Sequence, residues 1–257
     1  MRPILFTAWG FRVASAPVFA GFAALAAYGY FAARRRELPV SEDDFWGIIA
    51  SLALGTFVGA VGFYSLLYGG GFGHNVDRLQ RAAVPGGSFL GTYLGAAAAA
   101  ALYCRARGLR FAAVGDVLGG AAPLGLSVMR IGCLLNGCCY GRVCELPWGI
   151  VFNPPTVVPA RLQGLPLHPT QLYEAAGSLL IFFIVHRVLR PLIARGSLPQ
   201  GDALLASVCG YALLRFVNDF FRAGDPGLGA ALGLSMAQWL ALAALAVGAA
   251  RLIRERA

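Results

Sequence analysis

The stretch VASAPVFAGFAALAAYGYFAARRR, residues 13–36, decides the class of this protein. An uncharged run over 13–33 is followed directly by three arginines, and a helix needs about 20 apolar residues to cross the hydrocarbon core of a bilayer. The composition agrees, because 58% of the residues are hydrophobic, 13% are charged and the mean hydropathy is +0.67. Soluble domains average about 25% charged residues. The sequence therefore argues against a soluble domain, excludes a disordered chain and predicts a membrane helix over 13–33.

Further apolar runs of similar length follow along the chain, separated by short polar segments. We predict an all-α membrane protein that forms a single polytopic domain, residues 1–257, with a small outer head segment between the fourth and fifth helices. The seven predicted spans are 13–33, 45–68, 86–104, 111–129, 171–188, 203–221 and 232–250. The glycine content, 34 residues without a collagen period, suits closely packed membrane helices.

The positions of the arginines predict the orientation of these spans. All 21 basic residues are arginine, and 12 of them form four clusters that follow the first, third, fifth and seventh spans. Cytoplasmic loops of membrane proteins carry such an excess of positive charge. We therefore expect the N-terminus outside and the C-terminus in the cytoplasm. The net charge of +9 is explained by these loops, so no nucleic-acid partner is predicted.

Ionisable side chains inside a predicted span are costly and mark candidate sites. Arg215, Asp219 and Arg222 are spaced so that they share one face of the sixth helix. One interpretation is an ion pair at the outer end of the span, with side chains that reach the headgroups. However, two arginines beside one acid leave positive charge, which an anion such as a lipid phosphate would neutralise. We favour an anion site.

The densest motif is RIGCLLNGCCYGR, residues 130–142, where the fourth span meets the outer face. Arg130 is either an interfacial anchor or a functional residue. Four cysteines follow at spacings that fit no CxxC zinc pattern: Cys133, Cys138, Cys139 and Cys144. We rank apolar packing or a disulfide first, a catalytic thiolate second and a metal site last, and we predict that no metal binds here.

A second polar motif, HPTQLYE at 168–174, stands at the outer entry to the fifth span. His168 is either an interfacial loop residue or a participant in a site. Glu174 lies about one turn inside the membrane, where partnership with an intramembrane arginine is expected and does not exclude a functional role.

Three ordered motifs, together with shorter agreements, resemble one family. RIGxxxNGxxYG at 130–141, HPTQLYE at 168–174 and RFxxDFxR at 215–222 are similar to bacterial prolipoprotein diacylglyceryl transferase, and PWG at 147–149 and GLSMAQ at 233–238 agree too. The resemblance covers nearly the whole chain. It implies a seven-helix enzyme of the bacterial cytoplasmic (inner) membrane with the orientation predicted above.

The resemblance also implies a reaction and roles for individual residues. The family moves the diacylglyceryl group of phosphatidylglycerol to the thiol of a lipobox cysteine in a prolipoprotein signal peptide, without a metal or organic cofactor. The implied catalytic residues are Arg215, Asp219, His168 and Glu174. The implied substrate-binding residues are Arg130, Asn136, Gly137, Gly141 and Arg222.

The chain also departs from the family pattern. Ala16 and Leu90 occupy positions where the family usually has Tyr and His, and that His is the favoured general base; Cys133 and Cys138 replace Asn and Glu. Two interpretations follow. The first is an active transferase with another base, for which Tyr93, Tyr140, His168 and Glu174 are open and His168 is the first candidate and Glu174 the second; the other is a catalytically lapsed phospholipid-binding protein. A transporter has slight support from Asp116 in the fourth span. We favour the enzyme.

Overall fold

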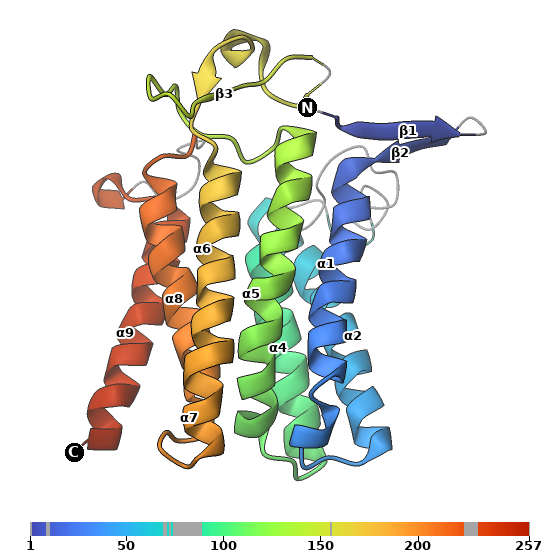
Figure 1. The fold of residues 1–257 in the computed structure, drawn as a ribbon, viewed down its shortest axis with the longest axis vertical. Helices are drawn as coiled ribbons and strands as arrows, with labels where there is room; N and C mark the ends of the chain where they lie inside the picture. The colour runs from blue at the N-terminus through green and yellow to red at the C-terminus, as the bar shows by residue number, and fades with distance from the viewer. Residues whose placement is uncertain are drawn as a thin grey trace. The chain divides into compact units, whose positions relative to one another are not determined.

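The structure is a computed structural model of the chain, and it describes residues 2–8, 11–68, 71, 73, 89–154, 156–223 and 231–256. Over these residues the protein is mainly helical, and its strands are short (Figure 1). It divides into two compact units, residues 1–34 with 115–257 and residues 35–114. The helices are α1 (Ser15–Ala32), α2 (Glu42–Tyr68), α4 (Phe89–Ala106), α5 (Phe111–Asn136), α6 (Thr170–Ile184), α7 (Arg190–Ala194), α8 (Asp202–Asp219) and α9 (Met236–Arg256).

A helix occupies each region where the sequence predicts a span, within the described residues. Five of them are long and apolar enough to cross a membrane: Ser15–Ala32, Glu42–Leu66, Phe111–Asn136, Thr170–Ala194 and Met236–Arg254. The protein is thus a helical membrane protein, as predicted. Residues 86–88 of the predicted third span lie outside the described part of the chain.

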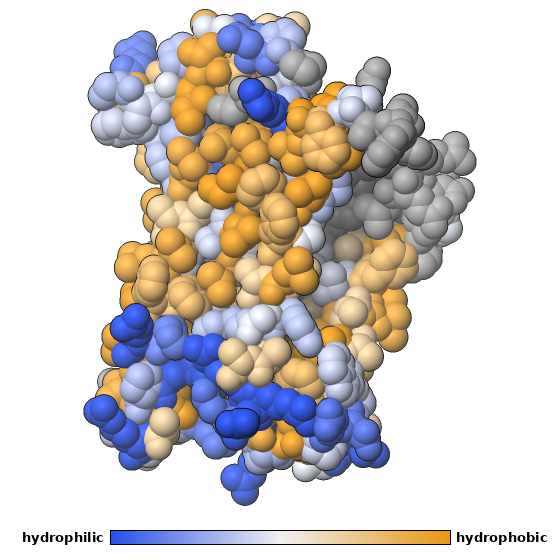
Figure 2. Space-filling view, turned by 45° about the vertical axis from the view of Figure 1, so that its right-hand side comes forward, coloured by the Kyte–Doolittle hydropathy of each residue, from blue (hydrophilic) through white to orange (hydrophobic). Residues whose placement is uncertain are grey.

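Apolar side chains that face outward support a lipid environment for these helices. Figure 2 shows hydrophobic residues over the middle of the drawn face and strongly hydrophilic residues gathered at one end. Leu25 on α1, Leu180 on α6 and Val247 on α9 are each at least 60% exposed. Such exposure is unfavourable in water and ordinary in lipid.

In the unit of residues 35–114, α2 and α4 pack through glycines. A Cβ atom placed on Gly55 would lie 2.3 Å from the carbonyl oxygen of Gly95, and one on Gly59 would lie 2.1 Å from that of Gly91. Small residues at this spacing let two membrane helices approach closely. Arg107 closes the end of the pair through an ion pair with Asp44, in which Nε and Oδ1 are 2.7 Å apart.

In the other unit, Asp116 caps the beginning of α8. Its carboxylate accepts hydrogen bonds from the backbone N–H groups of Gly201 (2.8 and 2.9 Å) and Ala203 (3.0 Å). A carboxylate at this position satisfies amides that have no partner within the helix and interacts favourably with the helix dipole. This role accounts for the buried acid that gave the transporter interpretation its support.

The fourth predicted span ends later than the sequence indicated. We expected it to end at residue 129, whereas α5 continues to Asn136, so Arg130 and Cys133 lie inside its last two turns. Gly137 then ends the helix with a left-handed φ of 74°. The charge of Arg130 favoured an early boundary in the sequence, but the buried ion pair described below lets the residue remain in the helix.

The chain between α5 and α6, residues 137–169, forms the head segment, which lies beyond the ends of these two helices in Figure 1. Its strands β3 (Ile150–Val151) and β4 (Pro166–Leu167) pair antiparallel over a small apolar core of Phe152, Val158 and Leu167.

The sequence predicted this segment but not the β1–β2 hairpin at Ile4–Ala8 and Phe11–Ala14, which precedes α1. The remaining short elements are η1 (Arg35–Glu37), η2 (Ala160–Leu162), the π-helical turn η3 (Val185–Leu189) between α6 and α7, and η4 (Ala231–Gly233).

Candidate active site

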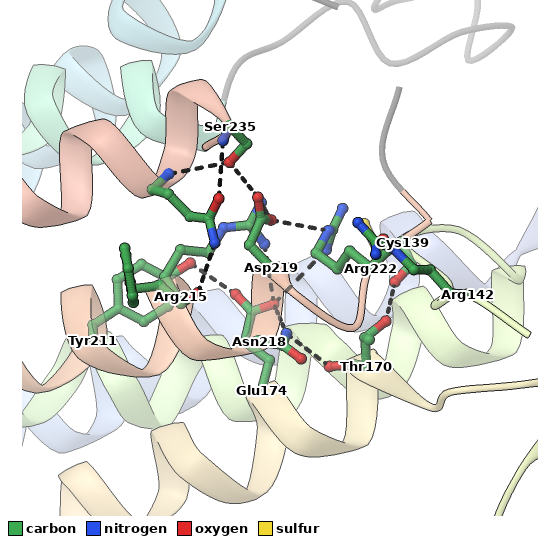
Figure 3. A network of polar contacts seen from close by, with 12 residues as sticks. Cys139, Arg142, Thr170, Glu174, Tyr211, Arg215, Asn218, Asp219, Arg222 and Ser235 are labelled. Atoms are coloured by element: carbon green, nitrogen blue, oxygen red, sulfur yellow. Dashed lines mark hydrogen bonds and ion pairs between the residues drawn. The ribbon is translucent and has the colours of Figure 1, made fainter. Parts of the chain in front are cut away.

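Glu174, on the first turns of α6, is the centre of a buried polar network (Figure 3). The residue is 0% exposed. Its Oε1 atom lies 2.6 Å from Nη2 of Arg130 on α5 and accepts a hydrogen bond of 2.7 Å from the hydroxyl of Tyr211 on α8. Its Oε2 atom accepts a hydrogen bond of 3.3 Å from Asn218. Hydrogen-bond donors and positive charges of this kind offset the cost of burying a carboxylate.

Two further arginines from the α8 region approach the same carboxylate. Nη1 of Arg215 lies 3.7 Å from Oε2 of Glu174, and Nη1 of Arg222 lies 4.0 Å from it. The side chains of Arg130, Arg215 and Arg222 are 7%, 21% and 19% exposed. We call these three residues the arginine cluster. Arg130 and Arg215, which the sequence named as candidate site residues on two different helices, both lie against Glu174, the intramembrane partner anticipated for an arginine.

Asp219 holds the α8 side of the arginine cluster in place. Its Oδ1 atom lies 2.9 Å from Nη2 of Arg215 and 3.7 Å from Nε of Arg222. The i, i+4 pair on α8 is the one that the sequence spacing predicts. Arg222 lies beyond the end of α8, in the turn that follows it, so the common helical face predicted for all three residues ends at Asp219.

The beginning of α9 is joined to this network. Ser235 donates a hydrogen bond to Oδ2 of Asp219, and its Oγ atom accepts one of 3.1 Å from the backbone N–H of Gln238. The side chain of Gln238 in turn accepts a hydrogen bond of 2.9 Å from the N–H of Ser235. This reciprocal pair is a capping box. The GLSMAQ motif therefore starts α9 and orients Asp219 at the same time.

The head segment is tied to the arginine cluster through Gly141. The backbone N–H of Gly141 donates to the carbonyl of His168 (3.0 Å), and that of Arg142 donates to the carbonyl of Phe221 (2.8 Å). A Cβ atom on Gly141 would lie 2.4 Å from the Cβ of His168 and 2.7 Å from the carbonyl oxygen of Phe221. Only glycine permits this approach. Gly141 thus shapes the backbone beside the arginine cluster.

Asn136 and Gly137 close the end of α5. Gly137 has a left-handed backbone, and a Cβ atom there would lie 2.7 Å from the Cβ of Thr156. Asn136 is the last residue of α5. Gly137 therefore sets the point where the head segment and its cysteines begin, next to the arginine cluster.

His168 lies in an aromatic group at the edge of the network. Its Nδ1 atom and the hydroxyl of Tyr173 are 3.1 Å apart, and the indole N–H of Trp148 donates to the same hydroxyl at 2.7 Å. The His168 ring is also tilted against Phe221 at a centroid distance of 5.1 Å. The contacts of its ring are therefore with aromatic residues, whereas its backbone joins Gly141 to the site.

Three cysteines lie on the other side of Arg130. Nη1 of Arg130 is 3.6 Å from the sulfur of Cys139 and 3.9 Å from that of Cys133. Hydrogen bonds from the thiols of Cys133 and Cys138, aided by the charges of Arg222 and Arg130, lower the pKa of Cys139 well below its usual range. All six cysteines have free thiols. The sequence did not predict that this cluster contacts the arginines.

The residues that sequence reasoning missed are polar side chains on apolar helices. Tyr211 and Asn218 bind Glu174 directly, and Thr170 and Gln171 bind the carbonyls of Cys139 (2.6 Å) and Cys138 (2.8 Å). Thr170 and Gln171 belong to the HPTQLYE motif, and Tyr211 and Asn218 flank Arg215 by about one turn. Their spacing of about one helical turn from Arg215 was the signal from which Tyr211 and Asn218 could have been predicted.

The two positions where the chain departs from the family pattern lie in different parts of the chain. Ala16 lies close to Gly132, near Arg130, and the side chain of Leu90 lies outside the described residues.

Known proteins share this sequence pattern over almost the entire chain. The prolipoprotein diacylglyceryl transferase family matches residues 3–254. Phosphatidylglycerol–prolipoprotein diacylglyceryl transferases are similar to the chain: that of Geobacter sulfurreducens is 34% identical over 84% of this chain and 80% of its own length, and that of Idiomarina loihiensis is 34% identical over 99% and 93%. That of Azoarcus sp. is 36% identical over 86% and 81%. With its motifs gathered around one buried carboxylate, the chain belongs to the prolipoprotein diacylglyceryl transferase family.

Proposed function

We propose that this protein is a phosphatidylglycerol–prolipoprotein diacylglyceryl transferase whose arginine cluster binds the phosphate of the lipid donor. The observation that carries the proposal is the charge of the network: three guanidinium groups, those of Arg130, Arg215 and Arg222, gather around two carboxylates, Glu174 and Asp219. The three arginines carry one positive charge more than these two acids neutralise, in a largely buried setting. A phosphodiester carries one negative charge, and guanidinium groups bind phosphate through a planar fork.

The acids position the arginines for that phosphate. Both oxygens of Glu174 are engaged by guanidinium, hydroxyl or amide groups, which suits a counter-ion that fixes the cluster and not a base that meets a thiol. Asp219 does the same for Arg215 and Arg222. Because the acids fix the guanidinium N–H groups in advance, these groups can stabilise the negative charge that develops on the departing glycerol phosphate, which lowers the barrier to its departure.

Of the candidate bases considered from the sequence, His168 is the one that we retain. Its ring is half-buried and hydrogen-bonded by Tyr173, and the backbone of the same residue is paired with Gly141 of the head segment. The reaction requires that the acceptor thiol lose its proton while its sulfur attacks the carbon of the diacylglyceryl group that is bonded to the phosphate. The bond between that carbon and the phosphate oxygen then breaks, and the oxygen keeps the electron pair beside the arginine cluster.

The placement in the membrane belongs to the same proposal. Seven spans, with the N-terminus outside and the C-terminus in the cytoplasm, put the head segment at the outer face of a bacterial cytoplasmic membrane. The exposed apolar side chains and the clustered arginines support this placement. A secreted precursor with a signal peptide and a lipobox cysteine would meet the site on that side.

The test is transfer in vesicles of defined lipid. The purified protein is mixed with a lipobox peptide in vesicles that contain phosphatidylglycerol, or phosphatidylcholine as the control lipid. We expect a diacylglyceryl thioether on the peptide and free glycerol phosphate only with phosphatidylglycerol, and no product from a peptide whose cysteine is serine. Binding of phosphatidylglycerol without any product would instead support the lapsed, lipid-binding interpretation.

A further inference from the structure

A second group of basic side chains lies at the end of the helices opposite to the head segment, where α1 ends and α7 begins (Figure 1). Tyr30 and Arg34 come from the end of α1, and His186 and Arg190 come from the end of α6 and the turn that follows it. We call these four residues the Tyr30 cluster. All four belong to one compact unit of the chain, and the transfer proposed above uses none of them.

The phenol of Tyr30 is the centre of this cluster and is 7% exposed. Its oxygen accepts a hydrogen bond of 3.2 Å from Nη1 of Arg190. The guanidinium carbon of Arg34 lies 3.6 Å from the centroid of the same ring, which is a cation–π contact. A Cβ atom on Gly120 would lie 2.5 Å from the phenol oxygen, so α5 leaves room for the ring because this residue is glycine. One buried side chain therefore holds two arginines from different helices.

The imidazole of His186 fixes the cluster without neutralising it. Its Nδ1 atom lies 3.1 Å from Nη2 of Arg34 and 3.3 Å from the hydroxyl of Tyr30. Since a guanidinium group only donates, Nδ1 accepts, and the ring is neutral with its proton on Nε2. The ring also stacks on Phe182 at a centroid distance of 5.5 Å. His186 lies in the π-helical turn η3, and such turns are frequent at functional sites.

The charges of the two arginines are not matched by the groups that hold them. Arg34 also donates to the carbonyl of Tyr30 (3.1 Å), which caps the last turn of α1, so these contacts are with a carbonyl, a phenol and an imidazole. The charge of Arg190 also acts on Asp116, whose carboxylate accepts the first amides of α8. The two arginines carry one positive charge more than this acid neutralises.

We propose that the Tyr30 cluster binds the headgroup of an anionic phospholipid in the leaflet opposite to the head segment, with the lipid phosphate between Arg34 and Arg190. Basic pockets between membrane helices are typical sites for anionic headgroups on the cytoplasmic side. Guanidinium groups bind phosphate through a planar fork. The name of this leaflet, cytoplasmic, rests on the orientation given under the proposed function; the lipid site itself does not.

The surroundings of the cluster suit a lipid better than free phosphate. Both arginines are half-buried, so a headgroup can reach them from the surface of the helices. Outward-facing apolar side chains precede the cluster within about two turns on both helices: Leu25 on α1 is 64% exposed, and Phe183 and Ile184 on α6 are 46% and 44% exposed. The acyl chains of a lipid held by the cluster would cover this apolar surface, from which inorganic phosphate gains nothing.

The test is photocrosslinking of the wild-type protein in phosphatidylcholine vesicles with a phosphatidylserine that carries a photoreactive group near its headgroup. The labelled residues are identified by mass spectrometry after proteolysis. We expect label within residues 26–34 and 183–190, displaced by unlabelled phosphatidylserine and not by additional phosphatidylcholine or by inorganic phosphate. This measurement uses the wild type alone and does not depend on the folding of any variant.

Variants then assign the site to its residues. Arg34→Gln and Arg190→Gln should each weaken the displacement by phosphatidylserine roughly five- to tenfold. Tyr30→Phe keeps the ring beneath Arg34 and removes the acceptor of Arg190, so it should weaken the displacement less than Arg190→Gln does. Arg254→Gln, the same change at an exposed arginine of α9, is the matched control and should leave it unchanged.

Several results would overturn the lipid site. Labelling that is unchanged in both Arg34→Gln and Arg190→Gln would do so, and so would equal displacement by phosphatidylcholine. Equal displacement by inorganic phosphate would assign the cluster to a free anion and not to a lipid. Absence of displaceable label in a wild type that carries out transfer would overturn this site while the proposed function stands. Displaceable label at both segments without any transfer would count against the proposed function and leave the lipid site intact.

Discussion

Glu174→Gln is the perturbation whose effect follows most directly from the structure. Glutamine keeps the shape and the acceptor for Tyr211, but it removes the charge that faces Arg130 at 2.6 Å and puts an amide in place of one acceptor oxygen. Of the two acids named in the network, Asp219 then remains, paired with Arg215 and Arg222. Breaking a buried ion pair by removing one partner costs about 3–5 kcal/mol, and Glu174 is 0% exposed.

The assay is thermal unfolding of the purified protein in detergent, followed by circular dichroism. For a chain of this size, 3–5 kcal/mol corresponds to a decrease of roughly 6–20 °C in the midpoint. Adding phosphatidylglycerol should restore more of the midpoint in Glu174→Gln than it adds to the wild type, because the phosphate replaces the missing negative charge. Phosphatidylcholine should not produce this difference.

The control is Glu145→Gln, which makes the same change on an exposed residue of the head segment. An exposed substitution of this kind is expected to alter stability by less than about 0.5 kcal/mol. If Glu174→Gln melts like Glu145→Gln, Glu174 is not the counter-ion of the arginine cluster. If both lipids restore the midpoint equally, the cluster does not recognise the phosphate of an anionic lipid.

Three further variants test other parts of the account. Gly141→Ala should destabilise the protein by about 1–3 kcal/mol, because its Cβ atom would lie 2.4 Å from that of His168, whereas Gly21→Ala, with no atom within 4 Å, should be neutral or slightly stabilising in the same melt. Asp116→Ala should cost about 1–3 kcal/mol, since it leaves the first amides of α8 without their acceptor; an unchanged midpoint would show that the cap contributes nothing. His168→Ala should lower the transfer rate about 10²–10⁴-fold, and full activity in this variant would eliminate His168 as the base.

The sequence carried enough information to locate the helices, because runs of about 20 apolar residues have few alternatives to a membrane helix. Their ends were harder to predict. Arg130 looked like the end of a span, yet the ion pair with Glu174 lets α5 continue to Asn136. The β1–β2 hairpin was missed because its strands are short and run without a polar break into α1.

The candidate site was predictable only in part, because contacts between different helices depend on how those helices pack. The pair Arg215–Asp219 follows from spacing on one helix, and the sequence named Glu174 as the partner of an arginine. Which arginine it binds depends on how α5, α6 and α8 pack, and a single sequence does not contain that information. The meeting of Cys133 and Cys138 depends on the left-handed turn at Gly137, where the backbone N–H of Cys138 donates to the carbonyl of Cys133, and spacing rules for cysteine motifs do not consider such a turn.

The most direct test of the central claim is a single-turnover transfer measurement with the wild type and Arg215→Gln side by side, in vesicles of phosphatidylglycerol with a lipobox peptide. Arg161→Gln, an exposed arginine of the head segment, is the control. Removing one charged group that stabilises the departing phosphate should lower the rate constant of transfer roughly 10²–10³-fold, while Arg161→Gln stays within about twofold of the wild type. A rate for Arg215→Gln equal to that of the wild type, in a correctly folded protein, would contradict the claim that the arginine cluster holds the phosphate.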